Sequence, residues 1–270
     1  MRIAFPSDFT RPGHSFATLL ASVVALWLLD GSPAYSAGLV EPFSYANGSL
    51  TAVSGGAWQF WEPGAGNATV AGGAMRFDGT TDVIRTFPAV LTAPGQTAII
   101  SFSINVNIAN TSEGYAMDFL PASAPFGGAN TNYANQFSLG FDYYVFSPQG
   151  MSSIDIATGT GSGTTVIQPG GFMTENVTHL IRIELARGAT NTAYSLFVDN
   201  GLLNQGTFIL TDPRGMNAVE LEQSGESSPS ATGFATVDNL NIIVPEPVSG
   251  SLLALGCIAL LTIRRRQNAF

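Results

Sequence analysis

ISFSINVNI, residues 100–108, is the stretch of sequence that decides the fold class. Apolar side chains stand at every second position, from Ile100 to Ile108, and serine or asparagine fills each position between them. Successive side chains of a β-strand point to opposite faces. This period of two therefore predicts a long strand with one buried face and one polar face.

The same period recurs along the chain, at residues 137–145, 181–185 and 194–198. Turn signals separate the apolar runs: the Asn-Gly pairs that begin at Asn47 and Asn200, and a glycine-rich stretch at 159–163. Between residues 37 and 243 no stretch has an amphipathic helical pattern, so nothing in the sequence would cover a parallel sheet. The sequence predicts one all-β domain at 37–243, an antiparallel jelly-roll sandwich.

The charge of residues 37–243 limits the partners of this domain. The stretch contains five arginines and no lysine against 16 aspartates and glutamates, a net charge of about −11. Such a surface repels nucleic acid and anionic lipid, and leaves neutral polysaccharide as a polymeric partner. The one cysteine, Cys257, lies outside the stretch, so the domain folds without a disulfide.

Residues 1–36 have the pattern of a signal peptide. Two arginines precede an apolar run at 16–29, which forms a helix too short for a comfortable permanent membrane span. Ala34 and Ser36 are the small residues that signal peptidase requires before its cut. We expect cleavage between Ser36 and Ala37, and export of the domain.

Residues 244–270 combine prolines, an apolar segment and a basic end. Pro245 and Pro247 cannot lie inside a helix, so a helix can begin only after them. Residues 248–263 carry no charge and would span about 24 Å as a transmembrane helix, somewhat less than the roughly 30 Å hydrocarbon core. The basic residues 264–266 would stay on the cytoplasmic side, which places the domain outside the cytoplasm.

This tail, VPEPVSGSLLALGCIALLTIRRR, resembles the PEP-CTERM sorting signal of Gram-negative bacteria. The resemblance implies that a membrane-embedded exosortase recognises the tail while it lies in the inner membrane, and that the protein ends at the cell surface or in the extracellular matrix. Family context associates such systems with exopolysaccharide and biofilm. A plain tail anchor is the alternative. The implied sorting signal consists of Pro245, Glu246, Pro247, Arg264, Arg265 and Arg266.

Several short stretches of the domain resemble exported concanavalin A-like jelly rolls, including laminin-G-type modules: EPFSYANGSL at 41–50, LGFDY at 139–143, HLIRIELARG and YSLFVDNGLL at 179–203, and ATVDNL at 235–240. In legume-type lectins of this fold, a similar strand and the loop after it hold calcium and manganese. Asp142 matches the strand aspartate, but Gly140 replaces the acidic residue before it, and residues 145–150 offer neither Asn nor Asp. We expect no cofactor. Calcium is the one metal ion that this comparison leaves open.

Asp238 and Asn239, in the last predicted strand, are candidates for a metal or structural hydrogen-bonding role. Patterns of common catalytic centres are missing: the sequence has no E-x-D-x-x-E strand of laminarinase-like hydrolases, no G-x-S-x-G and no phosphate loop. Glu220 and Glu222 would share one strand face about 7 Å apart, which favours two solvated glutamates. His179 has no nucleophile pattern nearby and is expected at the surface. We therefore expect no catalysis.

Aromatic side chains provide the candidate ligand-binding residues, because flat rings stack on sugars while polar groups bond their hydroxyls. In WQFW, Trp58 and Phe60 are expected to share one strand face, with Trp61 on the other. Trp61, Asp142 and Tyr144 are the candidates. The main prediction is a surface or matrix protein with a structural or interaction role. The alternatives are a lectin-like module for a neutral glycan and, after it, a glycoside hydrolase.

Overall fold

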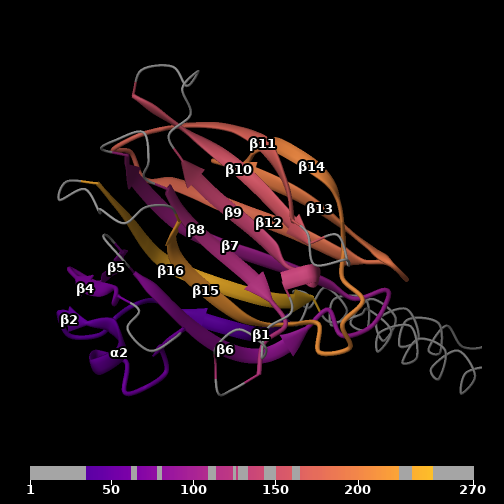
Figure 1. The fold of residues 1–270 in the computed structure, drawn as a ribbon, viewed down its shortest axis with the longest axis horizontal. Helices are drawn as coiled ribbons and strands as arrows, with labels where there is room; N and C mark the ends of the chain where they lie inside the picture. The colour runs from indigo at the N-terminus through magenta and orange to yellow at the C-terminus, as the bar shows by residue number, and fades with distance from the viewer. Residues whose placement is uncertain are drawn as a thin grey trace, which may run out of the picture. The chain divides into compact units, whose positions relative to one another are not determined.

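Nearly all regular structure of the computed structural model belongs to two antiparallel β-sheets (Figure 1). The structure describes residues 35–61, 66–77, 81–108, 114–123, 126, 133–142, 150–159, 165–224 and 233–245. These residues fall almost entirely within one compact unit, Ser36–Pro245. The prediction of an antiparallel β-sandwich is confirmed.

The larger sheet has nine strands among the described residues: β1 (Tyr35–Glu41), β2 (Gly48–Ser49), β4 (Thr69–Ala71), β5 (Ala74–Phe77), β7 (Thr97–Asn107), β12 (His179–Arg187), β13 (Asn191–Val198), β14 (Gly201–Ile209) and β16 (Phe234–Pro245). Their order is β14-β13-β12-β7-β16-β5-β4-β2, and β1 pairs with β16. In Figure 1, β2, β4, β5 and the short helix α2 (Leu50–Val53) gather at one end.

The smaller sheet has seven strands among the described residues: β3 (Gln59–Phe60), β6 (Asp82–Val90), β8 (Gly114–Leu120), β9 (Phe137–Asp142), β10 (Met151–Gly159), β11 (Thr165–Thr174) and β15 (Met216–Ser224). Their order is β11-β10-β9-β8-β15-β6-β3. A 3-10 turn, η2 (Tyr133–Asn135), precedes β9. The position of β15 between β8 and β6 is the feature of this sheet that builds the candidate site.

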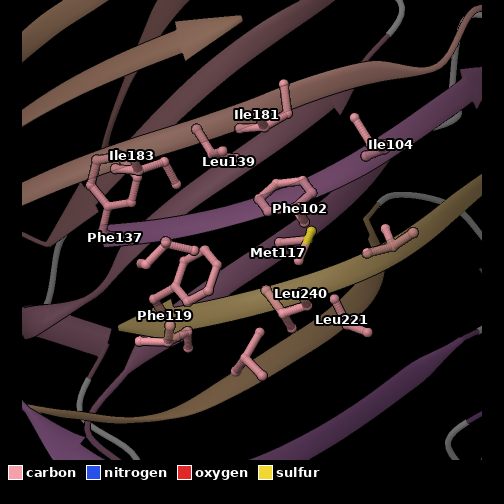
Figure 2. Packing of buried hydrophobic residues seen from close by; sticks show 14 of the residues in the cluster. Phe102, Ile104, Met117, Phe119, Phe137, Leu139, Ile181, Ile183, Leu221 and Leu240 are labelled. Carbon is pink, nitrogen blue, oxygen red and sulfur yellow. The ribbon is translucent and has the colours of Figure 1, made fainter. Parts of the chain in front are cut away.

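Strand β7 confirms the alternating pattern that decides the fold class. Ile100, Phe102, Ile104 and Val106 are fully buried, and the polar residues between them are partly exposed. The strand pairs with β12 on one side and β16 on the other, so it lies inside the nine-stranded sheet. The hydrophobic core fills the space between the sheets. In Figure 2, Phe102 and Ile181 of the larger sheet lie near Met117 and Leu139 of the smaller one.

The predicted turn after residue 198 is a tight hairpin. Asp199 and Asn200 have φ angles of 50° and 68°, and Val198 pairs with Gly201. Two left-handed residues in a two-residue loop match the twist of the flanking strands. The Asn-Gly signal is thus displaced by one position, because the left-handed pair is Asp-Asn and the glycine begins β14.

The expected signal-peptide helix at 1–36 and the expected transmembrane helix at 248–263 fall almost wholly on residues 1–34 and 246–270, which lie outside the described residues. Within the described ranges, no helix has the length and apolar character needed to cross a membrane. The Ser36–Ala37 bond lies near the start of β1, and Pro245 is the last residue of β16.

Candidate functional site

Strand alternation places four carboxylates on the outer face of the seven-stranded sheet. In β8 and β15, Met117, Phe119, Val219 and Leu221 point into the core between the sheets. The residues between them face the other way. They include Asp118 of β8 and Glu220 and Glu222 of β15, and Asp82 of β6 belongs to the same rows. We call Asp82, Asp118, Glu220 and Glu222 the carboxylate face.

The strand register sets the neighbours of each carboxylate. Glu220 stands opposite Asp118 on one side and Ile84 on the other. Glu222 stands opposite Asp82, with Ala116 on its other side. Residues directly opposite each other in antiparallel strands have Cβ atoms about 4.5–5.5 Å apart. Three strands far apart in the sequence therefore bring four acidic groups together.

Two of these carboxylates are buried. Glu220 is 1% exposed and Asp118 is 4% exposed, whereas Asp82 and Glu222 are partly exposed. The prediction of two solvated glutamates is wrong for Glu220, which lies in an interior strand with β8 on one side and β6 on the other. Asp82 and Glu222 are the members of the carboxylate face that solvent reaches.

Burial and mutual repulsion make these groups unusually weak acids. Burial, together with the negative charges of Glu222 and Asp82, raises the pKa of Asp118 to about 7, although a hydrogen bond from Ser138 opposes the change. Burial and the neighbouring acids raise the pKa of Glu220 to about 10, and burial raises that of Glu222. The site can therefore hold protons at neutral pH that ordinary carboxylates have lost.

The described basic side chains have partners elsewhere in the unit. Their partners are Glu41 for Arg85, Glu184 for Arg182, the Leu91 carbonyl for Arg187, Asp212 for Arg214, the Phe234 ring for Arg76 and Asp199 for His179. One oxygen of Asp118, Oδ1, is buried without a hydrogen-bond partner among the described residues. An acidic cluster held in this way costs folding free energy, which is typical of a functional site.

An aromatic cluster adjoins the carboxylate face. Trp61 packs with Ile84, Ala122 and Ala218, and Phe126 lies against it with ring centroids 6.3 Å apart. Ile84 is the residue opposite Glu220. Of the predicted ligand-binding residues, Trp61 is thus placed beside the acids, although it is only 7% exposed.

Trp58 and Phe60 of the WQFW stretch do not lie on a common face as predicted. Trp58 is fully buried in the main core, whereas Phe60 is 45% exposed. They do not share a buried face, because β3 is a two-residue edge strand and Trp58 lies outside it. Asp142 pairs through its backbone with Gly114 and Ser153 at the end of β9; its side chain and Tyr144 lie outside the described residues.

The remaining candidates have structural partners. Both carboxylate oxygens of Asp238 accept hydrogen bonds from Asn239, at 2.7 and 2.9 Å. His179 is 8% exposed and contacts Asp199 at 2.7 Å, so the prediction of a surface histidine is wrong. The sorting residues 246, 247 and 264–266 lie outside the described residues. Within the described ranges no group of three His, Cys, Asp or Glu residues has the arrangement to hold a metal ion.

No protein-family model and no curated protein matches the sequence. Solved structures do match the fold. An endo-1,3-β-glucanase from Streptomyces sioyaensis superposes with a TM-score of 0.53 at 14% identity, covering 80% of this chain and 100% of that one. The alginate lyase Aly36B, solved with an alginate trisaccharide, has a TM-score of 0.50 at 11% identity, covering 80% and 99%. At such identities the likeness shows the fold.

This finding contradicts the prediction that the chain has no catalytic function, since both of these structures are enzymes of the same β-sandwich fold. The sequence argument looked for carboxylates spaced along one strand. The structure instead collects them from β6, β8 and β15, which a search for a linear motif does not detect.

Proposed function

We propose that the domain binds a neutral polysaccharide on the carboxylate face and hydrolyses its glycosidic bonds. One observation carries the proposal: four carboxylates converge on adjacent positions of three strands, and burial and repulsion keep some of them protonated. Groups tuned in this way are what acid–base chemistry at neutral pH requires.

Glycoside hydrolysis uses two carboxyl groups, one protonated and one ionised, about 5–5.5 Å apart in retaining enzymes and about 6.5–9.5 Å apart in inverting ones. Glu222 and Asp82 stand opposite each other and are the solvent-accessible pair. We assign Glu222 as the general acid, because burial raises its pKa, the direction that favours the protonated form. Asp82 is then the base or nucleophile.

Asp118 and Glu220 lie beside this pair and act as positioning residues. Each is buried, and the two face each other across β8 and β15. Glu220 also forms a hydrogen bond with Asp82. That bond holds the Asp82 carboxylate in a fixed orientation, which a reacting group needs.

The charge of the site favours a neutral substrate over an acidic one. A uronate polymer would bring further carboxylates to a face that already carries four, and like charges repel. Beyond Glu222, the same row continues through Ala116 and Gly140 to Asp155. The small side chains of Ala116 and Gly140 leave space above the sheet between two acidic groups.

The test is a hydrolysis assay with soluble neutral glucans, including a β-1,3-linked one, and with alginate as the acidic comparison. We expect reducing ends to appear from a neutral glucan, and Glu222→Gln to abolish the reaction while the glucan still binds. The matched control is Glu184→Gln, because Glu184 lies on the other sheet in an ion pair with Arg182. Equal activity of both variants would refute the assignment.

Binding without cleavage is the second candidate. The burial of Asp118 and Glu220 favours it, because a ligand from solution reaches only Asp82 and Glu222 directly. Affinity electrophoresis in the same glucans separates the two functions. Retarded migration without released reducing ends would identify a binding module, and unretarded migration in every glucan would refute both functions.

We also propose that the domain is exported and sorted through its C-terminal tail. The resemblance of residues 244–266 to a PEP-CTERM signal supports this, as does the charge pattern of residues 1–36. Mass spectrometry of the protein from its own host tests it. We expect a mature chain that begins at Ala37 and lacks residues after the Pro-Glu-Pro; an intact chain that ends at Phe270 would indicate a plain anchor.

A further inference from the structure

A small polar pocket lies on the outer face of the nine-stranded sheet, on the sheet that does not carry the carboxylate face. Its volume is about 210 Å³. The side chains that reach it from β7 and β16 belong to the polar rows of those strands, since their apolar neighbours point into the core. The lining residues with outward-facing side chains are Ala74, Ser103, Asn105, Thr178, Thr236 and Asp238.

The polar groups of this pocket form an ordered array. Asn105 stands opposite Thr236, and Ser103 stands opposite Asp238. The Thr236 hydroxyl donates to the backbone carbonyl of Asn105 at 3.5 Å. Hydrogen bonds from the Asn239 amide groups fix the Asp238 carboxylate. The pocket therefore presents hydroxyl, amide and carboxylate oxygens in set positions.

One of these oxygens lacks a partner. Oδ1 of Asn105 is buried and has no hydrogen bond within the described part of the chain. A buried acceptor left unsatisfied is unfavourable, and most such atoms in folded proteins are paired. A ligand that donates a hydrogen bond inside the pocket would satisfy it.

The backbone of β16 is adapted at the same place. Its register with β7 shifts between Asp238 and Asn241, and Asn239 has a φ of 53°. Such a β-bulge redirects a side chain and is common beside functional sites. Here the bulge begins at Asp238, which is one of the residues that line the pocket.

These features select the chemistry of the ligand. Oxygen acceptors require a ligand rich in hydroxyl donors. The single carboxylate repels anions, and calcium requires six to eight oxygen ligands, which a pocket with one acidic side chain is poor at supplying. The volume lies below the roughly 300–1,000 Å³ of pockets that enclose drug-sized ligands, so the ligand is no larger than one sugar unit.

We infer that this polar pocket is a second glycan-binding site, which holds one neutral sugar unit through Asn105, Thr236 and Asp238. It lies on a different sheet from the carboxylate face, so it does not depend on the function proposed for that face. A domain with both sites would hold a polysaccharide at two separate points.

Saturation-transfer NMR with a panel of neutral methyl glycosides tests the inference, using the full domain with Glu222→Gln so that the carboxylate face cannot turn over ligand. We expect transfer to at least one methyl pyranoside. Thr236→Val, which keeps the shape and removes the hydroxyl, should weaken binding about tenfold or more, and so should Asn105→Leu. Ser195→Ala, on the same sheet face but outside the polar pocket, should bind like the parent.

Thermal melting separates a ligand role from a structural one. Asn105→Leu removes an unsatisfied acceptor, so the melting temperature should stay unchanged or rise while binding falls. Three results would overturn the inference: no methyl glycoside binds, binding is unaffected by both pocket variants, or calcium or inorganic phosphate alone binds there in place of the sugar.

Discussion

Glu41 and the carboxylate face show two opposite ways of burying acidic groups in one domain. Glu41 is 1% exposed, like Glu220. Its carboxylate accepts hydrogen bonds from the Phe43 amide, the Tyr45 hydroxyl and the Trp58 indole, and pairs with Arg85. Glu220, by contrast, has other acids as its nearest charges.

The two sites differ in how their buried charges are compensated. The donors around Glu41 join β1, Trp58 and β6, so this charge is compensated and holds the N-terminal part of the unit to the seven-stranded sheet. At the carboxylate face, the charges that shift the pKa values of Asp118 and Glu220 are those of other acids. Keeping these acids together lowers the stability of the fold, which is why the proposed function is placed at the carboxylate face.

The largest change in the free energy of unfolding is expected from removing the charge of Glu41, which pairs with Arg85. Glu41→Gln leaves the Arg85 guanidinium without its counter-charge in a partly buried position, so the free energy of unfolding should fall by about 3–5 kcal/mol. Urea unfolding followed by tryptophan fluorescence measures it. Adding Arg85→Met should restore part of the loss, because the unpaired charge is then gone. A loss below about 1 kcal/mol for Glu41→Gln would show that this network is not structural.

The second effect concerns pH, and its sign follows from the raised pKa values of the carboxylate face. Folded Asp118 keeps its proton up to about pH 7 and Glu220 up to about pH 10, whereas in the unfolded chain both lose it near pH 4. Their contribution to the free energy of unfolding is fully present below pH 4. It is lost as the pH rises toward the folded-state pKa values of about 7 and about 10. Unfolding should therefore become easier between pH 4 and pH 8, by several kcal/mol.

Asp118→Asn is the control for this pH dependence. The variant should reduce the slope between about pH 4 and 7 without abolishing it, because Asp118 no longer titrates there whereas Glu220 still does. Urea midpoints at matched ionic strength measure it. A wild-type protein whose stability rises over the same range would contradict the assignment of raised pKa values.

A third test expects a change in the free energy of unfolding opposite in sign to that of Glu41→Gln. Glu220→Gln replaces a group that must take up a proton on folding with a neutral one of the same shape, so the domain should be more stable by about 1–3 kcal/mol at pH 7. Under the proposed function the same substitution should also reduce hydrolysis, because it alters the hydrogen bond between Glu220 and Asp82. Gain of stability with loss of activity is expected of a functional site; loss of both would place Glu220 with Glu41 as a structural residue.

Sequence periodicity is enough to predict the strands and the sandwich, because alternation is a local property. The stretch at 100–108 matches β7, and the one at 137–145 begins where β9 does, at Phe137. The alternation around Asp118 in β8 was also available: Tyr115, Met117 and Phe119 are apolar, so Asp118 must face away from them. That pattern indicates a buried strand in which one acidic side chain, that of Asp118, faces away from the core.

The order of strands in the sheet is not local, and the site depends on it. Glu220 and Glu222 share a face on sequence grounds, but only the pairing of β15 with β8 brings Asp118 to them, across about 100 residues of chain. Burial of Glu220 follows from the same pairing. The prediction of a solvated Glu220 was therefore wrong, because the sequence does not show which strands flank β15.

The smallest change in the free energy of unfolding is expected at Asp199, whose carboxylate has hydrogen-bond partners but is exposed. The Asp199 side chain is 56% exposed, and it accepts hydrogen bonds from the Leu180 amide and His179, which hold its pKa below the usual range. Asp199→Asn keeps a residue that tolerates the left-handed turn and removes only the charge. The free energy of unfolding at pH 7 should fall by about 1 kcal/mol, less than at Glu41 because water replaces part of the lost interaction.

The matched control for this hairpin is Asn200→Gly, which also accepts the left-handed backbone and should change stability by only a few tenths of a kcal/mol. Since the pKa of Asp199 is lowered, its contribution persists above pH 4 and is lost below it, opposite in direction to the carboxylate face. Urea midpoints at pH 3 and pH 7 for the two variants therefore distinguish Asp199, which is exposed and paired, from Glu41, which is buried and paired, and from the carboxylate face, which is buried among other acids. An Asp199→Asn loss as large as that of Glu41→Gln would mean that partners, and not burial, determine what a carboxylate contributes to this fold.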